Sequence, residues 1–344
     1  MATAREWLEG ARLRTLSVST APVLAGTGVA WSVTGAEPPY ASGWASFAVS
    51  LVPFVLCLLV GLALQVGGNF SNDYSDGVRG TDTHRVGPMR LVGSGAAPPG
   101  AVKRAAWISF ALAGVIGLIL ASMAAGLLQV HAPGAPRVPV SVLTFVLVIL
   151  VGAACVVAAW FYTGGAKPYG YMGLGEVFVF IFFGVVATVG TVVVQSPPVC
   201  ASDATGAGIA CPRQIAWGPT LVAAVVMGCF AMAVLVANNL RDLDTDARAG
   251  KITLPVRLGD RRTRVFYAIL IAVSVVGLVV ISWWTTWFAL VSLLGAAMVL
   301  PSLVRVMRGA TGRDLIHVLK WTGLSELATA VLLAVGLGIG WFHG

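Results

Sequence analysis

Long apolar stretches alternate with short polar ones along most of this chain. A helix needs about 20 apolar residues to cross a bilayer core of ~30 Å, and nine stretches come close to that length. Because the stretches are continuous rather than alternating, they favour helices over a barrel. The pattern predicts an all-α polytopic membrane protein with about nine transmembrane helices. They lie near 15–33, 47–70, 105–128, 140–162, 173–195, 217–239, 265–283, 285–304 and 322–341.

Charge refines this picture. Only 10% of the residues are charged, against about 25% in soluble domains. The formal net charge of +8 could suggest a nucleic-acid partner, but topology explains it better. All of the 22 Lys and Arg residues except Arg137 and Arg213 fall in the N-terminal segment or in loops that nine spans place on one side. The positive-inside rule makes that side cytoplasmic. We therefore expect a cell-membrane protein with a cytoplasmic N-terminus, an outer C-terminus and no nucleic-acid partner.

The chain is predicted to form one membrane-embedded domain over residues 1–344. Residues 1–14 form an amphipathic cytoplasmic segment without the small-residue cleavage site of a signal peptide. The outer loops are poor in charge and rich in Pro, Gly, Ala and Ser. One of them holds Cys200 and Cys211, which a disulfide could close in an oxidising compartment, or which could both be free.

Polar residues gather where the second span ends. Asn69, Asp73 and Asp76 are spaced i, i+4 and i+7, so they share one face of a continuing helix. A carboxylate costs roughly 2.5–3.5 kcal/mol near the centre of a membrane helix and less toward its ends, so the cluster indicates a function. Gly77 and Gly80 predict the end of the helix. Other polar residues of this stretch are Asn72, Arg79, Asp82 and Arg90.

A second cluster ends the sixth span. Asn238, Asp242 and Asp246 are spaced i, i+4 and i+8, again roughly on one face, and Arg241 and Lys251 accompany them. Both clusters contain Asn-x-x-x-Asp with a further Asp one turn later. This weak internal repeat predicts two acidic faces on either side of one cavity at the cytoplasmic end.

Carboxylate and amide oxygens beside cations have a definite chemistry. Mg²⁺ keeps several waters and binds through a few carboxylates plus substrate phosphates, and Arg and Lys pair with the remaining phosphate oxygens. The two clusters thus predict a diphosphate held with two Mg²⁺ ions at a membrane surface. A solvated charged face is the alternative. We keep that alternative for Asp82, Asp244, Asp260, Arg248 and Arg264 individually.

The loop before the fifth span adds Tyr162, Lys167 and Tyr169, and Glu176 begins that span. Glu176 could act in the site or could simply satisfy the helix dipole. We expect His317 and Glu326, at and in the last span, to be buried and partnered. An aromatic run could line an apolar tunnel, although helix packing explains it equally well. The run consists of Phe178, Phe180, Phe182 and Phe183.

Two stretches, Asn72–Asp82 and Asn239–Asp246, resemble the Asp-rich motifs of the UbiA superfamily of intramembrane prenyltransferases. Three more are similar to the branch that prenylates 1,4-dihydroxy-2-naphthoate in menaquinone synthesis: Arg12–Leu16, Lys167–Glu176 and Gly250–Gly259. The resemblance covers residues 10–265, and the last two spans match only in being apolar. Where the broader superfamily has its third Asp, this chain has Gly80, and Asp82 follows two residues later.

The resemblance implies nine helices around a central cavity with a cytoplasmic active site. It also implies Mg²⁺-dependent transfer of the prenyl chain of a polyprenyl diphosphate to 1,4-dihydroxy-2-naphthoate, with loss of CO₂, giving demethylmenaquinone. By position, one Mg²⁺ would be held by Asn69, Asp73 and Asp76, and the other by Asn238, Asp242 and Asp246. The diphosphate would contact Arg79, Arg90, Lys167, Arg241 and Lys251. Asp73, Lys167 and Asp242 would also be catalytic, while roles for Asn72, Asp82, Tyr162, Tyr169 and Glu176 stay open.

Two other functions remain as alternatives. Another member of the superfamily would differ mainly in the pocket for its acceptor. A transporter would carry intramembrane charges along a pathway reaching both faces, whereas the acids of this chain cluster at one face.

Overall fold

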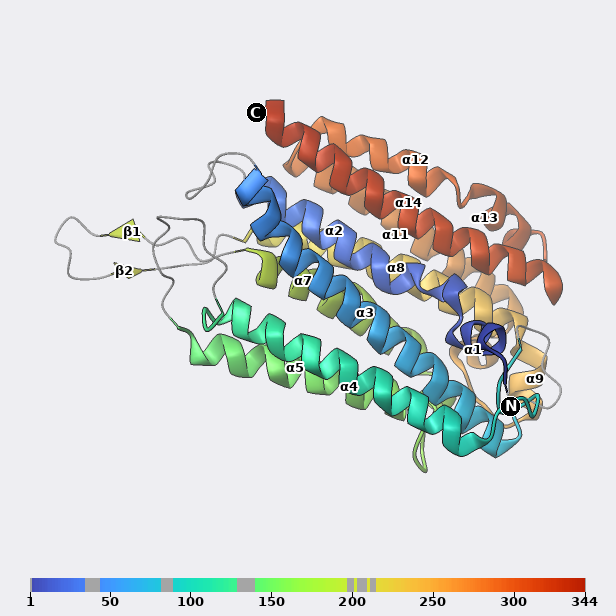
Figure 1. Cartoon of the computed structure of the whole chain (residues 1–344). Helices are drawn as coiled ribbons and strands as arrows, with labels where there is room; N and C mark the ends of the chain where they lie inside the picture. Colours follow the sequence, from blue (N-terminus) through green and yellow to red (C-terminus); the bar gives the residue numbers. More distant parts are fainter. Residues whose placement is uncertain are drawn as a thin grey trace.

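The computed structural model describes residues 2–34, 44–81, 89–128, 140–196, 201–202, 209–210 and 215–343. Its long helices lie side by side in one elongated bundle, and the two ends of the chain lie at opposite ends of that bundle (Figure 1). The long helices are α2 (Ser17–Thr34), α3 (Trp44–Arg79), α4 (Pro99–Ala124), α5 (Val142–Phe161), α8 (Trp217–Arg241), α11 (Asp260–Trp284) and α14 (Arg313–His343).

Two spans are built from several pieces. One joins α6 (Gly175–Val179), the π-helix η3 (Phe180–Val186) and α7 (Ala187–Gln195). The other joins η4 (Trp287–Val291), α12 (Ser292–Ala297) and α13 (Leu300–Met307), with a bend of 44° before α13. The separation predicted between the seventh and eighth spans is confirmed, because α11 ends at Trp284. The exposed tryptophans Trp283, Trp284 and Trp287 lie at this junction, as an interfacial belt would.

The expected count of nine spans is not confirmed. Among the described residues, seven helices are long and apolar enough to cross a membrane, and the bent pair makes an eighth. The remaining predicted span is α2, which has many Ser, Thr and Gly residues. Ala21, Ala25 and Val29 of α2 are completely buried, because α2 packs against α7, α8 and α14. Small residues suit such a helix, since they allow close approach of neighbouring backbones.

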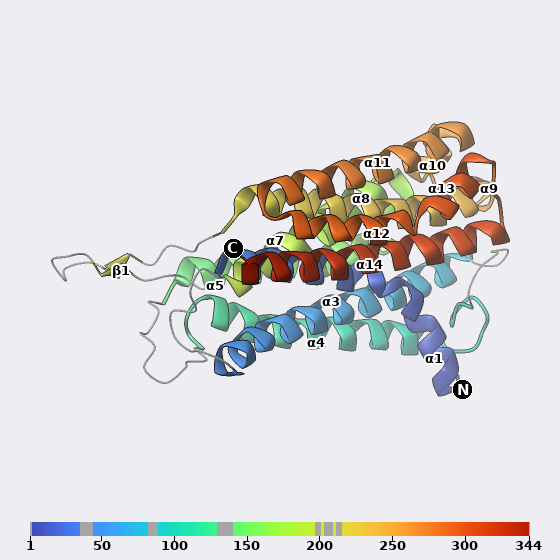
Figure 2. The same cartoon turned by 90° about the horizontal axis from the view of Figure 1, so that it is seen from above.

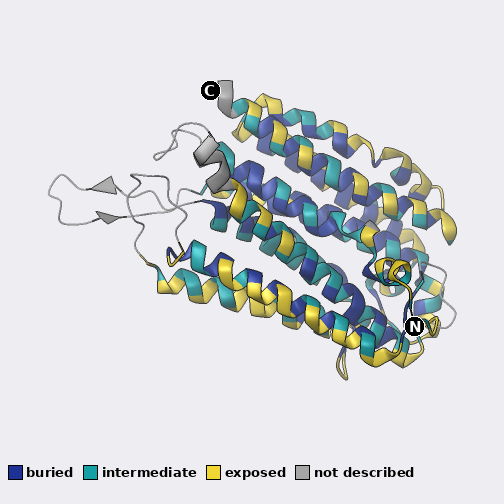
Figure 3. Cartoon of the chain, in the orientation of Figure 1, coloured by how far each residue is buried: buried dark blue, intermediate teal, exposed yellow. Residues whose placement is uncertain are grey.

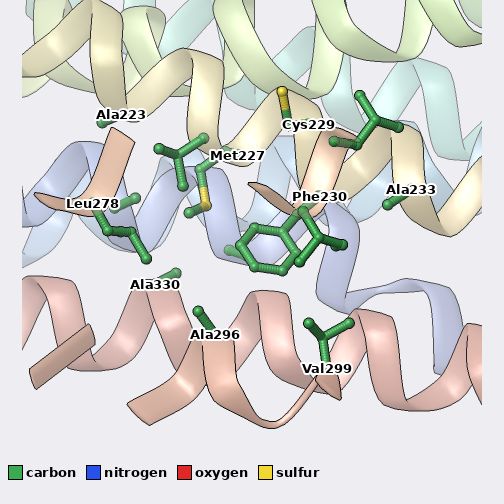
Figure 4. Packing of buried hydrophobic residues seen from close by; sticks show 14 of the residues in the cluster. Ala223, Met227, Cys229, Phe230, Ala233, Leu278, Ala296, Val299 and Ala330 are labelled. Atoms are coloured by element: carbon green, nitrogen blue, oxygen red, sulfur yellow. The ribbon is translucent and has the colours of Figure 1, made fainter. Parts of the chain in front are cut away.

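The core lies around α8. Met227 and Phe230 of α8 are completely buried and pack against Leu278 of α11 and Val299 beside α13 (Figure 4). At the other extreme, α5 has only Ala158 buried among its residues, and Figure 3 shows exposed positions along it. The outward face of α5 is therefore the kind of surface that lipid covers.

Short elements cap the two ends of the bundle. The predicted cytoplasmic end carries α1 (Ala4–Ala11), η1 (Leu13–Thr15), η2 (Tyr169–Met172), α9 (Leu243–Arg248) and α10 (Leu254–Leu258). The opposite end carries a small antiparallel hairpin of β1 (Ala201–Ser202) and β2 (Ile209–Ala210) (Figure 1), and the view from above in Figure 2 shows β1 beyond the ends of the long helices. Cys200 and Cys211, predicted as a possible disulfide, lie outside the described residues.

Candidate active site

A cavity runs from the α1 and α9 end of the bundle into its interior, with about 1420 Å³ of empty space including its mouth. Its walls come from α2, α3, α5, η3 and α8. Near the mouth the lining is polar, and deeper it is apolar. The predicted site residues that line the cavity are Asn69, Asn72, Asp76, Arg90, Tyr162, Tyr169, Asn238 and Lys251.

Asp76 of α3 is the acid of the first cluster that borders the cavity. Its Oδ1 accepts a hydrogen bond of 2.8 Å from the hydroxyl of Tyr171, and its Oδ2 lies 3.6 Å from the guanidinium of Arg90. Asn72 lies one turn earlier, and its Oδ1 accepts a 2.8 Å hydrogen bond from Thr163. A buried carboxylate near hydrocarbon needs such partners. The helix ends after these residues, at Arg79, as predicted.

Asp73 takes a different position from the one its spacing suggested. The side chain is completely buried but does not border the cavity. Its two oxygens accept backbone hydrogen bonds of 2.8 and 3.0 Å from Leu91 and Val92. Asp73 therefore fastens the segment after α3 onto the helix, and this contact brings Arg90 to the cavity.

The helix that carries the second cluster is interrupted at Asp242, which the spacing did not predict. The helix α8 ends at Arg241, and α9 begins at Leu243. The backbone amide of Asp242 still donates to the carbonyl of Asn238, and that of Asp246 to the carbonyl of Asp242, so the three residues keep the helical spacing that was expected. The guanidinium of Arg241 binds both oxygens of Asp242 at 2.7 and 2.6 Å and also donates to Asn238.

Beyond the break, Asp246 is buried and lies 3.6 Å from Lys251, whose side chain borders the cavity. The same lysine nitrogen lies 5.3 Å from the ring centre of Tyr171, and the guanidinium of Arg79 lies 5.5 Å from it. Tyr171 thus contacts both acidic clusters, since its hydroxyl binds Asp76. Sequence reasoning missed Tyr171, because nothing in the spacing distinguishes it from Tyr169.

Tyr162 borders the cavity together with Asp76 of the first cluster and Asn238 of the second. The two acidic motifs, far apart in sequence, share one region of the molecule, as the repeat predicted.

Three predicted diphosphate ligands do not border the cavity, namely Arg79, Lys167 and Arg241, the last of which binds Asp242. Lys167 is exposed and does not border the cavity. Arg79 donates hydrogen bonds to the backbone carbonyls of Thr163 and Gly165, so it ties α3 to the loop after α5. Asp82 lies outside the described residues.

Glu176 is buried in the first turn of α6. Its Oε1 accepts a 2.9 Å hydrogen bond from the amide of Asn239, while its Oε2 has no hydrogen-bond partner. Asn239 borders the cavity. Glu176 therefore orients a wall residue and is more than a charge at the start of a helix.

The expectation for the last span is wrong for His317 and half right for Glu326. His317 is exposed and lies beside Trp321, because it falls on the outer face of α14. Glu326 is completely buried, as expected, but neither of its oxygens has a hydrogen-bond partner.

The aromatic run divides in two. Phe178, Phe182 and Phe183 line the deep part of the cavity, and Phe178 stacks on Tyr169 at 3.9 Å between ring centres. Phe180 instead packs over Gly228 of α8. The wider turn of the π-helix η3 is the type of distortion often found at functional sites. The tunnel prediction is therefore confirmed for three of the four residues.

The donor set fits Mg²⁺ bound together with a phosphate-bearing ligand. Within the described parts of the chain, no three His, Cys, Asp or Glu side chains gather as a self-sufficient metal site. Mg²⁺ does not require one, since one or two carboxylates and substrate phosphates complete its coordination. Asp76 and Asp246 offer carboxylates, Asn69, Asn72 and Asn238 offer amide oxygens, and Arg90 and Lys251 stand ready for phosphate oxygens.

Known proteins are similar to this chain in sequence and in fold. The chain is 44% identical over 340 residues to the 1,4-dihydroxy-2-naphthoate octaprenyltransferase of Mycobacterium tuberculosis, covering 99% of each chain. It is 32% identical to the Escherichia coli protein of the same name, covering 96% of this chain and 94% of that one.

Among solved structures, a UbiA homolog from Archaeoglobus fulgidus bound to DMAPP and Mg²⁺ matches with a TM-score of 0.53 and 14% identity, covering 96% of this chain and 99% of that one. A UbiA homolog from Aeropyrum pernix K1, without ligand, matches with a TM-score of 0.56 and 14% identity, covering 94% and 97%. These likenesses show the fold. The UbiA prenyltransferase family matches residues 20–324, and the chain therefore belongs to this family of membrane prenyltransferases.

Proposed function

We propose that this protein transfers the prenyl chain of a polyprenyl diphosphate to 1,4-dihydroxy-2-naphthoate, releasing CO₂ and diphosphate. The observation that carries the proposal is the cavity itself. Asp76 and Arg90 from the first motif line it together with Asn238 and Lys251 from the second, and Lys251 pairs with Asp246. Aromatic and aliphatic side chains line the rest of the cavity. The names of the full-length relatives support the choice of acceptor.

The substrate's polar and apolar halves match the two ends of this cavity. Arg90 and Lys251 would pair with diphosphate oxygens, exchanging their present partners Asp76 and Asp246 for them. Mg²⁺, bound by these carboxylates and nearby amide oxygens, would supply Lewis-acid stabilisation of the leaving diphosphate. Lys167, exposed in this structure, stays a prediction as a diphosphate ligand.

The apolar part protects the reaction. When the allylic C–O bond breaks, the electron pair leaves with the diphosphate and the prenyl carbon becomes cationic. Phe178, Phe182 and Phe183 would hold the chain and keep water from that carbon. The electron-rich ring then forms a C–C bond at its carboxylate-bearing carbon. Loss of CO₂ returns an electron pair to the ring and yields the hydroquinone form of demethylmenaquinone.

The orientation proposed from charge places the cavity mouth at the cytoplasmic face of the cell membrane. Arg241 ends α8 directly before α9, and Arg90 and Lys251 border the cavity that opens at this end of the bundle. A water-soluble acceptor made in the cytoplasm would reach the site from that side, and the prenyl diphosphate from the bilayer.

Proteoliposomes containing the purified protein test the proposal. With polyprenyl diphosphate, 1,4-dihydroxy-2-naphthoate and Mg²⁺, we expect demethylmenaquinone and labelled CO₂ from carboxyl-labelled acceptor. Omitting divalent metal should stop the reaction. Product formed equally with 4-hydroxybenzoate, or none with the naphthoate, would contradict the proposed acceptor.

A further inference from the structure

A groove on the surface of the bundle lies apart from the cavity. It forms where α10 ends and α11 begins, and it holds about 760 Å³ of empty space including its open side. Gly259 makes the corner between the two helices with φ 75°, a value that glycine adopts without strain. The corner places the end of α10 beside the first turns of α11. The groove is lined by Leu258, Arg261, Arg262, Val265, Phe266 and Ile269, none of which borders the cavity.

The groove carries two positive charges that the protein does not neutralise. Arg261 and Arg262 are exposed, and within the described residues neither makes a hydrogen bond or an ion pair. The acid beside them, Asp260, is already taken. Its two carboxylate oxygens accept hydrogen bonds of 2.7 and 2.6 Å from the guanidinium of Arg264. Arg264 is itself buried and donates to two carbonyls near the end of α13.

Next to the two arginines the groove is apolar and faces outward. Val265 and Ile269 are 45% and 51% exposed, whereas Phe266 is half-buried against the core. The exposed apolar face of α11 continues to Ala272. From Arg262 to Ala272 the helix rises by about 15 Å, half of the ~30 Å core of a bilayer. The groove and the helix face below it therefore match one leaflet, with charge at its surface and apolar side chains over its depth.

The position of the groove along the bundle favours the inner leaflet. The span α11 begins at the end that α9 and α10 cap, which is predicted to be cytoplasmic, and it ends at the exposed Trp283 and Trp284. The cytoplasmic leaflet has a negative surface potential from its anionic lipids, and basic pockets beside transmembrane helices bind the headgroups of such lipids. The charge of the groove is thus complementary to the membrane surface that it faces.

We propose that this groove binds an anionic phospholipid, with the phosphate at Arg261 and Arg262 and one acyl chain along Val265 and Ile269. The inference goes beyond the proposed function and does not depend on it, because no residue of the groove lines the cavity. Arginine suits this role, since its planar guanidinium presents several donors to phosphate oxygens. A bound lipid contacts both α10 and α11 and so stabilises the corner between them. A solvated basic surface is the alternative, and it predicts no preference for a lipid.

Lipid binding to the full-length protein, purified in detergent and stripped of lipid, tests the assignment. Native mass spectra are recorded with equal amounts of phosphatidylglycerol and phosphatidylcholine, and thermal unfolding is measured with each lipid separately. We expect phosphatidylglycerol to be retained in preference to phosphatidylcholine. Phosphatidylglycerol should also raise the unfolding temperature, because a ligand that binds only the folded state stabilises it. Inorganic phosphate at the same concentration should leave that temperature unchanged.

Two variants of the groove are compared with one control. Arg261→Gln/Arg262→Gln removes both charges and should weaken phosphatidylglycerol binding at least tenfold. Val265→Glu keeps both arginines but places a carboxylate one helical turn from Arg261, where it competes with the phosphate, so it should weaken binding as well. Arg5→Gln/Arg104→Gln is the matched control and should bind normally. It also removes two exposed positive charges, but from α1 and α4, across the bundle from α11 (Figures 1 and 2).

The outcomes are distinct. Equal retention of the two lipids, or unchanged phosphatidylglycerol binding in Arg261→Gln/Arg262→Gln, would overturn the proposal. An equal loss in the control variant would show an effect of net charge and overturn it too. Stabilisation by inorganic phosphate to the same extent would assign the groove to a free anion. Displacement of phosphatidylglycerol by an equal amount of polyprenyl diphosphate, lost in Arg261→Gln/Arg262→Gln, would assign it to that substrate instead.

Discussion

At the scale of residues, the acids of this site are already paired before any ligand arrives. Asp76 contacts Arg90 and Tyr171, and Asp246 contacts Lys251. Removing one member of a buried pair leaves an uncompensated charge, which costs far more than losing a surface ion pair. The protein therefore keeps a charged site at the edge of hydrocarbon by supplying its own counter-ions. We infer that these counter-ions pass to the diphosphate when the substrate binds.

Neutralising Asp76 tests the site directly. Asp76→Asn keeps the size of the side chain but removes the charge that faces Arg90. We expect kcat to fall by roughly 10²–10³, the range for removing one group that stabilises charge in a transition state. Asp244→Asn is the control, because Asp244 is exposed on α9 and should keep full activity. Product formation in proteoliposomes measures both, and equal activity of the two variants would contradict the assignment.

Tyr171 gives a second prediction. Tyr171→Phe loses the hydrogen bond to Asp76 but keeps the ring beneath Arg79 and Lys251. One such bond is worth about 1–1.5 kcal/mol, so we expect kcat/KM to fall about tenfold. The kcat/KM of Tyr171→Ala should be lower still, because this variant also loses the cation–π contacts, each worth about 0.5–1 kcal/mol.

The pH dependence of this effect follows from the phenol. Burial, and then the charge of Asp76, raise the pKa of Tyr171 above its ordinary value. The folded state therefore favours the protonated phenol. The contribution of its hydrogen bond to Asp76 is lost only as the pH rises through that raised pKa. We therefore compare the activity of the unchanged protein with that of Tyr171→Phe. The ratio of the two should stay constant from about pH 7 to about pH 9, below the ordinary tyrosine pKa of about 10. A ratio that shrinks over this range would show that the phenol ionises there.

Residue positions were predictable only where one helix carries the pattern. Spacing placed Asn69, Asp73 and Asp76 on one face of α3, and Asn69 and Asp76 do line the cavity. It could not show that Asp73 binds backbone amides of Leu91 and Val92, because that contact depends on a loop folding back. Long-range partners such as Tyr171 leave no periodic signal either.

At the scale of elements, the crossing of η3 and α8 shapes the cavity wall. A Cβ on Gly184 would come within 2.5 Å of the Gly228 Cα, and a Cβ on Gly228 within 2.6 Å of the Phe180 ring. The two glycines let the helix backbones touch, as small residues do in membrane bundles. Phe178, Phe182 and Phe183 are then held facing the cavity.

This contact predicts a stability difference between two similar substitutions. Gly184→Ala must push apart two backbones, and overpacking of this kind costs typically ~1–3 kcal/mol. Gly190→Ala lies on α7 with nothing within 4 Å of the added Cβ, so its better helix propensity should stabilise the protein by up to ~1 kcal/mol. Thermal unfolding in detergent measures both. The idea fails if Gly184→Ala is as stable as Gly190→Ala.

Element prediction succeeded where hydropathy alone decides. All nine apolar stretches are helical within the described residues. The break at Asp242 was not predictable, because a spacing of i, i+4 and i+8 is compatible with an unbroken helix. The π-helix was hidden too, since its extra residue per turn depends on packing against α8.

At the scale of the whole molecule, the two ends of the chain lie at opposite ends of the bundle (Figure 1), as the proposed orientation requires. Cysteine labelling tests the proposed orientation in a background with Cys200 and Cys211 replaced by Ser. Arg308 follows α13 at the end predicted to be cytoplasmic, and Leu128 follows α4 at the end predicted to be outside; both residues are exposed. A membrane-impermeant maleimide should label Leu128→Cys in intact cells but Arg308→Cys only after permeabilisation. The reverse pattern would invert the topology.

The central claim is that two acidic motifs hold one diphosphate at the mouth of one cavity. A crystal structure with Mg²⁺ and a non-cleavable prenyl thiodiphosphate tests it most directly. We predict diphosphate density contacting both Arg90 and Lys251, metal density at Asp76 and Asp246, and the prenyl chain along Phe178 and Phe182. Diphosphate bound by only one motif, or held at Lys167 outside the cavity, would contradict the claim.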